Sequence, residues 1–251
     1  MSNTPKHRKT TTMTIQEAIE ARHSVRAYRE QPLEEETVKA LEEEIALLNR
    51  EGRLHIQLVL NEQKAFQGTL AKYGKFRGVA NYIIMAGKKS EDLEERVGYY
   101  GEHLVLVAQT LGLNTCWAVL TYSKVPGTYV LAEDEKIVSY IAIGYGVTQG
   151  VGHKIKTVEQ VSRSAVRTSG SSRNASDDTP SWFRKGVEAA LLAPTAVNQQ
   201  KFFFEYLGKE NNRHKVHAKR SFSLIGYTRI DLGIAKYHFE VGAGKDNFIW
   251  V

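Results

Sequence analysis

The chain has 251 residues, 42% of which are hydrophobic, and its formal net charge is +6 at pH 7. That length allows one large hydrophobic core or two small ones. One cysteine, Cys116, excludes an internal disulfide framework and any CxxC metal or redox motif, and the scattered histidines predict no metal site. No apolar run reaches the roughly 18 residues of a membrane span, and no secretory signal pattern opens the chain, so we expect a cytoplasmic protein without a membrane partner.

The positive charge favours an anionic partner, and nucleic acid is the first alternative to consider. Part of the charge lies on Lys6, Arg8 and Lys9, within residues 1–13, which we interpret as a flexible basic tail. The consecutive phenylalanines at 202–204 point to both faces of a strand, as a buried strand requires, so they form no single platform for stacked bases. We therefore predict no nucleic-acid partner.

In chain order, the first predicted element is a short helix that ends near Arg22. Thr14 and Glu17 have the spacing of a capping box, and an apolar stripe follows them. Pro32 and an acidic first turn begin a second helix. Apolar runs then predict strands at 54–60, 82–86 and 137–143, and a buried helix at 99–111 that is closed by Gly112. We assign residues 14–161 to an N-terminal half.

Residues 162–180 are rich in Ser, Thr, Asn, Asp and Arg and bury too little apolar surface to offset the entropy of ordering, so we predict a linker or flexible crossover. A C-terminal half, residues 181–251, follows with predicted helices at 182–192 and 230–241 and strands at 202–207 and 248–251. Residues 45–60 parallel residues 189–207, and residues 101–104 parallel residues 232–235. The predicted fold class is α+β, with two diverged half-domains, each a β-sheet packed with helices.

A polar motif in the first half has the groups that bind phosphate. It follows the first helix and consists of Arg22, His23, Ser24 and Arg26. A planar guanidinium matches phosphate oxygens in a bidentate way, and the arginine charges must supply most of the attraction because a helix C-terminus does not attract anions. The alternative is that the two arginines share an exposed helical face and pair with Glu20 or Glu30.

A second polar motif lies in the other half. It is a proline turn followed by amides and comprises Pro194, Thr195, Ala196, Asn198 and Gln200. Backbone polar groups and amides suit the edge of a flat heteroaromatic ring better than a charge. The alternative is that residues 198–200 simply form a turn leading into the next strand. Together the two motifs predict a phosphorylated flavin held by both halves of one chain.

Four strings resemble the FMN-dependent nitroreductase family: Arg-His-Ser-Val-Arg-Ala-Tyr at 22–28, Gly-Leu-Asn-Thr-Cys-Trp at 112–117, Ile-Ala-Ile-Gly-Tyr-Gly at 141–146 and Ala-Pro-Thr-Ala-Val-Asn-Gln-Gln at 193–200. In ordinary members the proline-turn motif follows the phosphate motif within a few dozen residues, and two identical subunits build two flavin sites. Here the turn motif comes only in the second half, which resembles a two-repeat branch of the family. The resemblance implies a nitroreductase-like fold and one FMN per chain.

The resemblance also implies roles for individual residues. The FMN phosphate and ribityl chain would be bound by Arg22, Ser24 and Arg26, with His23 in the same segment. A second phosphate contact would come from Lys154 and Lys156, which are otherwise solvated loop lysines. The isoalloxazine edge would meet Pro194, Thr195, Ala196, Asn198 and Gln200. No catalytic side chain and no metal are expected, because the chemistry belongs to the cofactor.

The activity implied is a ping-pong reaction in which NAD(P)H reduces the flavin and then leaves. A nitroaromatic, a quinone or a related electron-poor acceptor takes its place. The alternative is a flavin-binding protein that stores or senses the cofactor without turnover. The chain is expected to act as a monomeric pseudo-dimer or as a homodimer.

Overall fold

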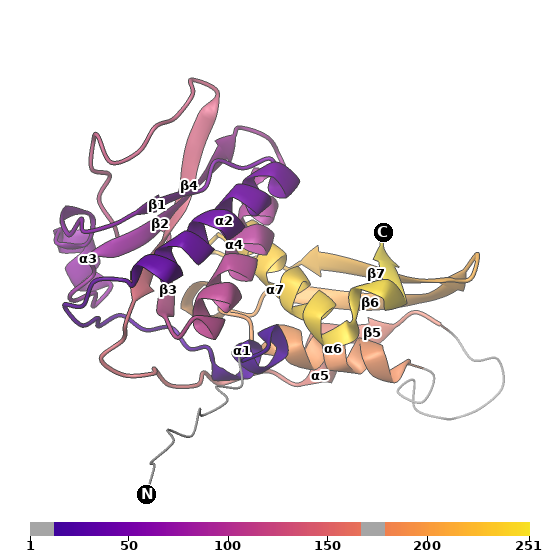
Figure 1. Ribbon diagram of the computed structural model, residues 1–251. Coiled ribbons are helices and arrows are strands. Elements are labelled where there is room, and N and C mark those ends of the chain that lie inside the picture. The colour runs from indigo at the N-terminus through magenta and orange to yellow at the C-terminus, as the bar shows by residue number, and fades with distance from the viewer. Residues whose placement is uncertain (1–12, 167–178) are drawn as a thin grey trace, which may run out of the picture.

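The computed structural model describes residues 13–166 and 179–251. Its elements form two lobes that meet at a pair of crossing helices (Figure 1). In chain order the first elements are α1 (Ile15–Ala21), α2 (Glu35–Gly52), β1 (Gln57–Val59), η1 (Lys64–Phe66), α3 (Thr69–Tyr73), β2 (Asn81–Lys88), α4 (Leu93–Thr110), β3 (Asn114–Ala118) and β4 (Glu135–Gly144). They are followed by α5 (Val158–Val161), β5 (Ser162–Ser164), α6 (Ser181–Leu191), η2 (Ala196–Asn198), β6 (Phe202–Glu210), β7 (Arg213–Arg220), α7 (Thr228–Ala243), η3 (Lys245–Asn247) and β8 (Phe248–Trp250).

The first sheet has the strand order β1-β2-β4-β3, and all neighbouring strands are antiparallel. Strand β2 is buried along almost its whole length because both of its faces are covered. Ile83 and Met85 pack with residues of α2 and α4, whereas Tyr82 and Ile84 point the other way into an aromatic cluster. This alternation follows from the two-residue period of a strand. The predicted core strand at 82–86 is therefore confirmed.

The second sheet has the order β5-β6-β7-β8. Strands β6 and β7 are antiparallel, and the outer strands β5 and β8 are parallel to their neighbours. Strand β5 corrects one prediction, because it begins the range 162–180 that we assigned to a linker. Ser162 lies opposite Phe204 in the ladder, so backbone pairing with a buried strand orders a polar segment that has no apolar residues of its own. The rest of that range from 167 to 178, and the tail from 1 to 12, lie outside the described residues.

Strand β7 was not predicted. Its sequence is basic, and Val216 is its one fully buried side chain, so the hydrophobic alternation that reveals a half-buried strand is weak. The strand forms because β6 supplies its backbone partners along Arg213–Arg220. Strand β7 therefore depends on its pairing with β6, and hydrophobic periodicity in the sequence gives no information about such pairing.

Helices α4 and α7 cross where the two halves meet, and each places a glycine at the contact. A Cβ on Gly98 would lie 2.1 Å from the carbonyl oxygen of Ile230, and one on Gly233 would lie 2.0 Å from that of Glu95. This reciprocal arrangement is that of a two-fold axis between two related helices. The sequence comparison aligned Gly101 with residue 232. In the structure Gly98 is equivalent to Gly233, so the two helices are aligned about one helical turn away from the predicted pairing.

Helix α1 packs across the junction of the two halves. Its predicted capping box is confirmed, because the Thr14 hydroxyl accepts from the Glu17 backbone N–H at 3.2 Å and Glu17 Oε2 accepts from the Thr14 N–H at 2.7 Å. Ile19 packs with Ala189 and Tyr237 of the second half. The end of α1 is therefore held beside both half-domains. Within the described ranges, none of the helices combines the length and apolarity needed to cross a membrane.

Candidate functional site

The first polar motif lies on an extended segment, residues 22–28, that leaves the end of α1. Arg22 ends that helix with φ −71° and ψ 125°. The Val25 N–H donates to the Thr115 carbonyl at 3.0 Å, and the Arg77 N–H donates to the Arg26 carbonyl at 2.8 Å. The alternative of an exposed helical face is therefore wrong. In an extended segment residues two apart share a side, so Ser24 and Arg26 face a cavity while Val25 is buried.

Arg22 is buried rather than exposed, with 3% of its surface accessible. Its Nη2 donates to the Leu192 carbonyl at 3.4 Å, and its Nε lies 3.7 Å from Glu102 Oε1. That Nε has no hydrogen-bond partner among the described residues. Arg22 therefore joins the end of α1 to α4 and to the loop after α6, and its ionic partner is Glu102, not Glu20 or Glu30.

Glu102 is the centre of a buried polar network between the halves. Its Oε1 lies 2.9 Å from His238 Nε2, and its Oε2 accepts from Trp117 Nε1 at 2.8 Å. The other ring nitrogen of His238 faces the Ala189 carbonyl at 3.1 Å. The network thus connects Arg22 with Trp117, which lines the candidate cavity. Buried polar groups without such partners would be strongly destabilising.

The second motif forms a strained turn after α6. Val197, Asn198 and Gln200 have φ values of 46°, 57° and 46°, in the left-handed region that non-glycine residues seldom adopt. Asp231 of α7 holds this turn, because its Oδ1 accepts from the Ala196 N–H at 2.9 Å and its Oδ2 accepts from Gln199 Nε2 at 2.6 Å. A carboxylate from another element therefore fixes the turn.

Three predicted site residues hold the turn together in this structure. Gln200 is buried, and its Nε2 donates to the Lys154 carbonyl at 2.8 Å. Asn198 Nδ2 donates to the same carbonyl at 2.8 Å. The Lys156 ammonium donates to the backbone carbonyls of Gln199 and Gln200 at 3.2 and 2.7 Å. Lys154, Lys156 and Gln200 line neither cavity described below, so their contact with a flavin remains a prediction.

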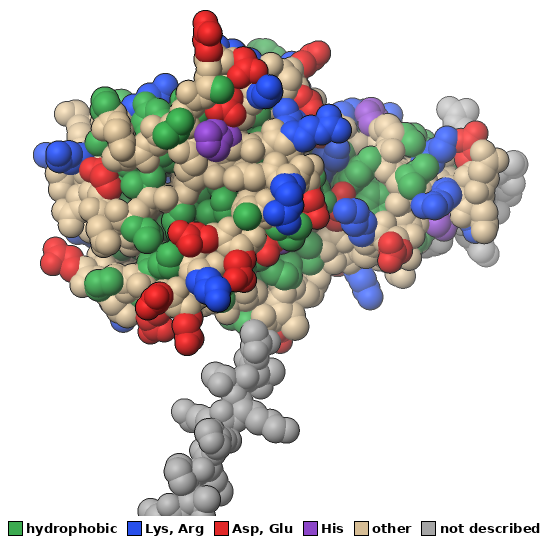
Figure 2. Space-filling model, turned by 45° about the horizontal axis from the view of Figure 1, so that its top comes forward, with side chains coloured by type: hydrophobic (Ala, Val, Ile, Leu, Met, Phe, Trp, Pro, Cys, Tyr) green, Lys and Arg blue, Asp and Glu red, His purple; other side chains and the backbone are tan. Residues whose placement is uncertain are grey.

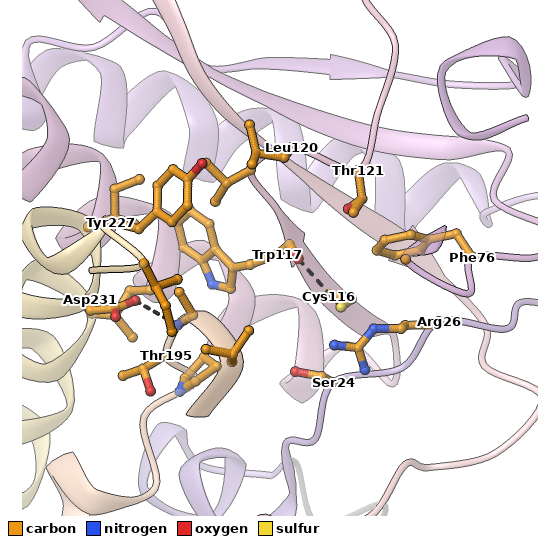
Figure 3. Close-up of a pocket in the computed structure, with 18 residues that line it drawn as sticks. Ser24, Arg26, Phe76, Cys116, Trp117, Leu120, Thr121, Thr195, Tyr227 and Asp231 are labelled. Carbon is orange, nitrogen blue, oxygen red and sulfur yellow. Dashed lines mark hydrogen bonds between the residues drawn. The ribbon is translucent and has the colours of Figure 1, made fainter. Parts of the chain in front are cut away.

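Two adjoining cavities bring the motifs of the two halves together. The first has a volume of about 310 Å³ and the second about 290 Å³. Figure 3 shows Ser24 and Arg26 facing the first cavity, with Thr195 on its other side. Both cavities are lined by Ser24, Arg26, Pro194, Thr195 and Val197. The second alone is lined by Arg22, His23 and Asn198, together with Val151, Gly152 and His153.

Arg22 and Arg26 line the second cavity and bring positive charge to it. Burial lowers the pKa of His23, and the nearby charges of Arg22 and His153 lower it further. Burial likewise lowers the pKa of His153; the hydrogen bond to the Leu191 carbonyl opposes this shift, and the nearby charges of Arg22 and His238 add to it. Arg26 has no ion pair or hydrogen bond from its side chain within the described residues. A dianionic phosphate would meet guanidinium, imidazole and hydroxyl donors here.

The two-fold relation between α4 and α7 defines an equivalent place in the other half, between α4 and β8. A cavity of about 320 Å³ lies there, but the charged side chains that line it are paired with one another. Lys236 Nζ donates to Glu95 Oε1 at 2.8 Å, the Tyr99 hydroxyl donates to Glu240 Oε2 at 2.5 Å, and Trp250 Nε1 donates to Glu240 Oε1 at 2.6 Å. The cationic segment of residues 22–28 has no counterpart there among the described residues. Among the described residues, a cavity that also contains this cationic segment therefore occurs once.

The sequence missed three lining residues that matter to the site. Trp117 both packs in the core and forms a cavity wall. Tyr227 also lines the first cavity. Asp231 had a visible signal, since it is an acidic residue between Ile230 and Leu232 on a buried helix. Cys116 is buried and lines the cavity too.

Asp231 should make the stability of the protein depend on pH. Burial raises its pKa from 3.8 to about 6. The folded state then favours the protonated form, so the contribution of Asp231 is fully present below pH 3.8 and is lost as the pH rises through about 6. Relative to Asp231→Asn, we expect the unfolding free energy of the wild type to fall by about 2 kcal/mol between pH 4 and pH 8, measured by urea denaturation.

Asp92→Asn serves as a control, because the pKa of Asp92 is shifted in the opposite direction. Hydrogen bonding from Ser90 lowers the pKa of Asp92, so the wild type should gain stability over Asp92→Asn as the pH rises. A difference between wild type and Asp231→Asn that stays constant across the range would contradict the assignment.

Comparison with known proteins identifies the class to which this fold and site belong. A solved structure described as a putative nitroreductase from Thermotoga maritima is 24% identical, covers 97% of this chain and 90% of its own, and superposes with a TM-score of 0.65. The α+β architecture with two sheets is thus that of a nitroreductase fold. The family model described as "Putative TM nitroreductase" matches residues 14–243. The chain belongs to this nitroreductase family, as its motifs predicted.

Smaller nitroreductases match part of the chain. A solved structure described as a putative nitroreductase from Desulfovibrio desulfuricans in complex with FMN is 15% identical and covers 59% of this chain and 94% of its own, with a TM-score of 0.46. An FMN-dependent nitroreductase from Clostridium difficile R20291 is 16% identical and covers 52% of this chain and 87% of its own, with a TM-score of 0.42. No curated protein matches the sequence.

Proposed function

We propose that the protein is an FMN-dependent oxidoreductase that takes hydride from NAD(P)H and reduces an electron-poor acceptor by a ping-pong mechanism. The observation that carries this proposal is the pair of adjoining cavities in which Ser24 and Arg26 of the first half meet Pro194 and Thr195 of the second. Membership of the nitroreductase family supports the same assignment. A binding site for one nucleotide cofactor needs both a phosphate end and a ring end, and the two cavities would supply them.

The residues present fit FMN. The phosphate would lie in the second cavity with His23, Ser24 and Arg26, and Arg22, whose charge is paired with Glu102, lines the same cavity. The ring would lie in the first cavity, between strand β3 and the turn at Pro194, Thr195 and Ala196. Asn198, Gln200, Lys154 and Lys156 would act mainly by holding that turn. One such site per chain predicts one FMN per chain.

The bound flavin would supply the redox chemistry, and the chain would bind, orient and shield it. With a quinone as acceptor, the balanced reaction is NAD(P)H + H⁺ + quinone → NAD(P)⁺ + hydroquinone. Trp117 and residues of β3 would exclude water from one side of the ring. Arg26 would contribute positive charge, which favours anionic cofactors.

Flavin storage without turnover is the competing function, and reduction kinetics separate the two. Nucleic-acid binding has less support, because acidic and basic side chains are interspersed on the face shown in Figure 2 and form no single basic stripe there. We also propose a cytoplasmic location and a monomeric or homodimeric assembly. The sole cysteine, Cys116, is a buried free thiol, which is compatible with a reducing compartment.

The proposal is tested by loading the purified protein with FMN and mixing it anaerobically with NADH or NADPH. We expect the visible flavin absorption to bleach, and to return when a quinone or a nitroaromatic is added. Bound flavin that neither nicotinamide reduces would support the storage function instead. A protein that does not retain FMN would refute both.

Arg26→Ala should weaken FMN binding about tenfold to hundredfold, because a charge-assisted hydrogen bond contributes about 1.5–3 kcal/mol. The affinity is measured by titrating FMN into apoprotein and following flavin fluorescence. Arg213→Ala removes an exposed arginine at the start of β7, away from both cavities, and should leave the affinity unchanged. Equal affinities for the two variants would exclude Arg26 from the phosphate site.

A further inference from the structure

The first cavity has a polar end and an apolar end. Ser24, Arg26, Pro194, Thr195 and Val197 line the end that it shares with the second cavity, so Val197 borders both cavities. Leu120 and Tyr227 lie across the cavity from Ser24 and Arg26 (Figure 3). The side chains that line the apolar part are Val119, Leu120, Val197, Ile225, Tyr227, Ile230 and Ile234.

Three of these apolar side chains are also open to solvent, and each comes from a different part of the chain. Leu120 follows β3 and is 63% exposed, Val197 lies in η2 and is 75% exposed, and Ile225 precedes α7 and is 51% exposed. Scattered exposed apolar residues are ordinary, but a cluster at a cavity mouth marks a binding surface. We call these three residues the apolar rim.

The rim is held in place rather than left loose. The Asn198 N–H donates to the Thr195 carbonyl at 2.9 Å, and the Ala196 N–H is bound by Asp231. These bonds hold Val197 in a backbone conformation that is unfavourable for a β-branched residue. The chain therefore maintains strain in a turn that presents an apolar side chain to solvent.

The apolar end offers no positive charge to an acceptor. Among the described residues that line the cavity, Asp231 is the one carboxylate, and both of its oxygens already accept hydrogen bonds from Ala196 and Gln199. An anionic acceptor would meet this carboxylate without a cation at that end. A neutral acceptor would not be repelled by the Asp231 carboxylate, and an apolar substituent on it would cover the rim.

We infer that the acceptor is a neutral quinone that carries an apolar side chain, with its ring in the first cavity and its side chain against Leu120, Val197 and Ile225. This inference rests on the proposed function and names its substrate class. The quinone gains two electrons and two protons to become the hydroquinone; hydride is supplied by the reduced cofactor and the second proton by water. Each methylene that the rim fully buries favours binding about fourfold.

The test compares two quinones with the same head group, 2,3-dimethoxy-5-methyl-1,4-benzoquinone and its 6-decyl derivative. FMN-loaded protein is reduced with dithionite, freed of excess reductant, and mixed with each quinone to give the rate of flavin reoxidation. Calorimetric titration of the oxidised protein gives the dissociation constants without turnover. We expect the decyl compound to bind at least tenfold more tightly and to react with a correspondingly higher second-order rate constant.

Leu120→Ser and Ile225→Ser should each reduce this preference for the decyl compound about threefold to tenfold, by shrinking the apolar rim. Val130→Ser is the matched control, since Val130 is 71% exposed and lines neither cavity, and it should keep the full preference. Equal affinity of the wild type for the two quinones overturns the inference, as does an equal loss of preference in all three variants.

Other occupants of the rim give different results. If the rim joins two copies of the chain, size-exclusion chromatography with light scattering will show a dimer that Leu120→Ser dissociates, and the inference fails. If the rim contacts a lipid surface, the protein will sediment with liposomes while the quinone preference is absent, which also overturns it. If neither quinone is reduced, the proposed function has failed and this inference fails with it; if only the preference is missing, the proposed function stands.

Discussion

Gly233→Ala is expected to reduce the unfolding free energy by about 3 kcal/mol or more and to lower the melting temperature by roughly 10 °C. A Cβ at this position would lie 2.0 Å from the Glu95 carbonyl oxygen and 2.7 Å from the Tyr99 nitrogen. These are backbone atoms of α4, so they cannot rotate away as a side chain could. The higher helix propensity of alanine offsets only about 1 kcal/mol of this clash.

The same substitution should release FMN, because Gly233 lies two residues from Asp231 on α7. Separating α4 from α7 would move Asp231 away from the turn that it holds at Ala196. Thermal denaturation measures the stability effect, and flavin fluorescence measures the release. Gly152→Ala is the control for stability, since its nearest contact would be His23 at 3.8 Å, and it should stay within about 0.5 kcal/mol of the wild type. A Gly233→Ala protein as stable as the wild type would show that the two helices do not cross in this way.

Glu102→Ala is expected to cost about 3–5 kcal/mol, because it leaves two buried basic groups without their shared acceptor. Glu102 is fully buried, and its carboxylate faces His238, Arg22 and the Trp117 indole. Urea denaturation gives the loss of stability. Because Trp117 loses its hydrogen-bond acceptor, we also expect its fluorescence emission to change in the folded variant.

An exposed ion pair provides the contrast for Glu102. Glu188 pairs with Arg184 one turn away on α6, at 3.0 Å, and about half of each side chain is exposed. Glu188→Ala should therefore cost less than about 1 kcal/mol. Removing both charges in Arg22→Met with Glu102→Leu should cost less than the sum of the single changes, since no unpaired charge remains. Similar losses for Glu102→Ala and Glu188→Ala would contradict a buried network.

Several elements could be predicted because local rules govern them. The capping box at Thr14 and Glu17 is a short-range pattern, and the helix starts where predicted. The apolar run at 82–86 needs burial on both faces, which a central strand provides. Strands β5 and β7 could not be found this way, because their residues are mainly polar and their order comes from pairing with β6.

Part of the site could be predicted because it, too, depends on local geometry. Ser24 and Arg26 reach the cavity because alternate residues of an extended segment share a side. Arg22 was expected to be equally available, but a carboxylate far along the sequence, Glu102, accounts for its burial. Asp231 was missed because its partners, Ala196 and Gln199, meet it only after α7 has docked.

The sequence alone determined where the principal helices and core strands form and which chemical groups each half contributes, since propensity, capping and periodicity act over a few residues. The tertiary structure alone decided which of those groups meet. Two glycines, Gly98 and Gly233, let α4 and α7 approach closely, and that approach places the turn at Pro194 beside the segment at Ser24. Contacts between distant residues depend on how helices and sheets pack, and packing is a property of the whole folded chain.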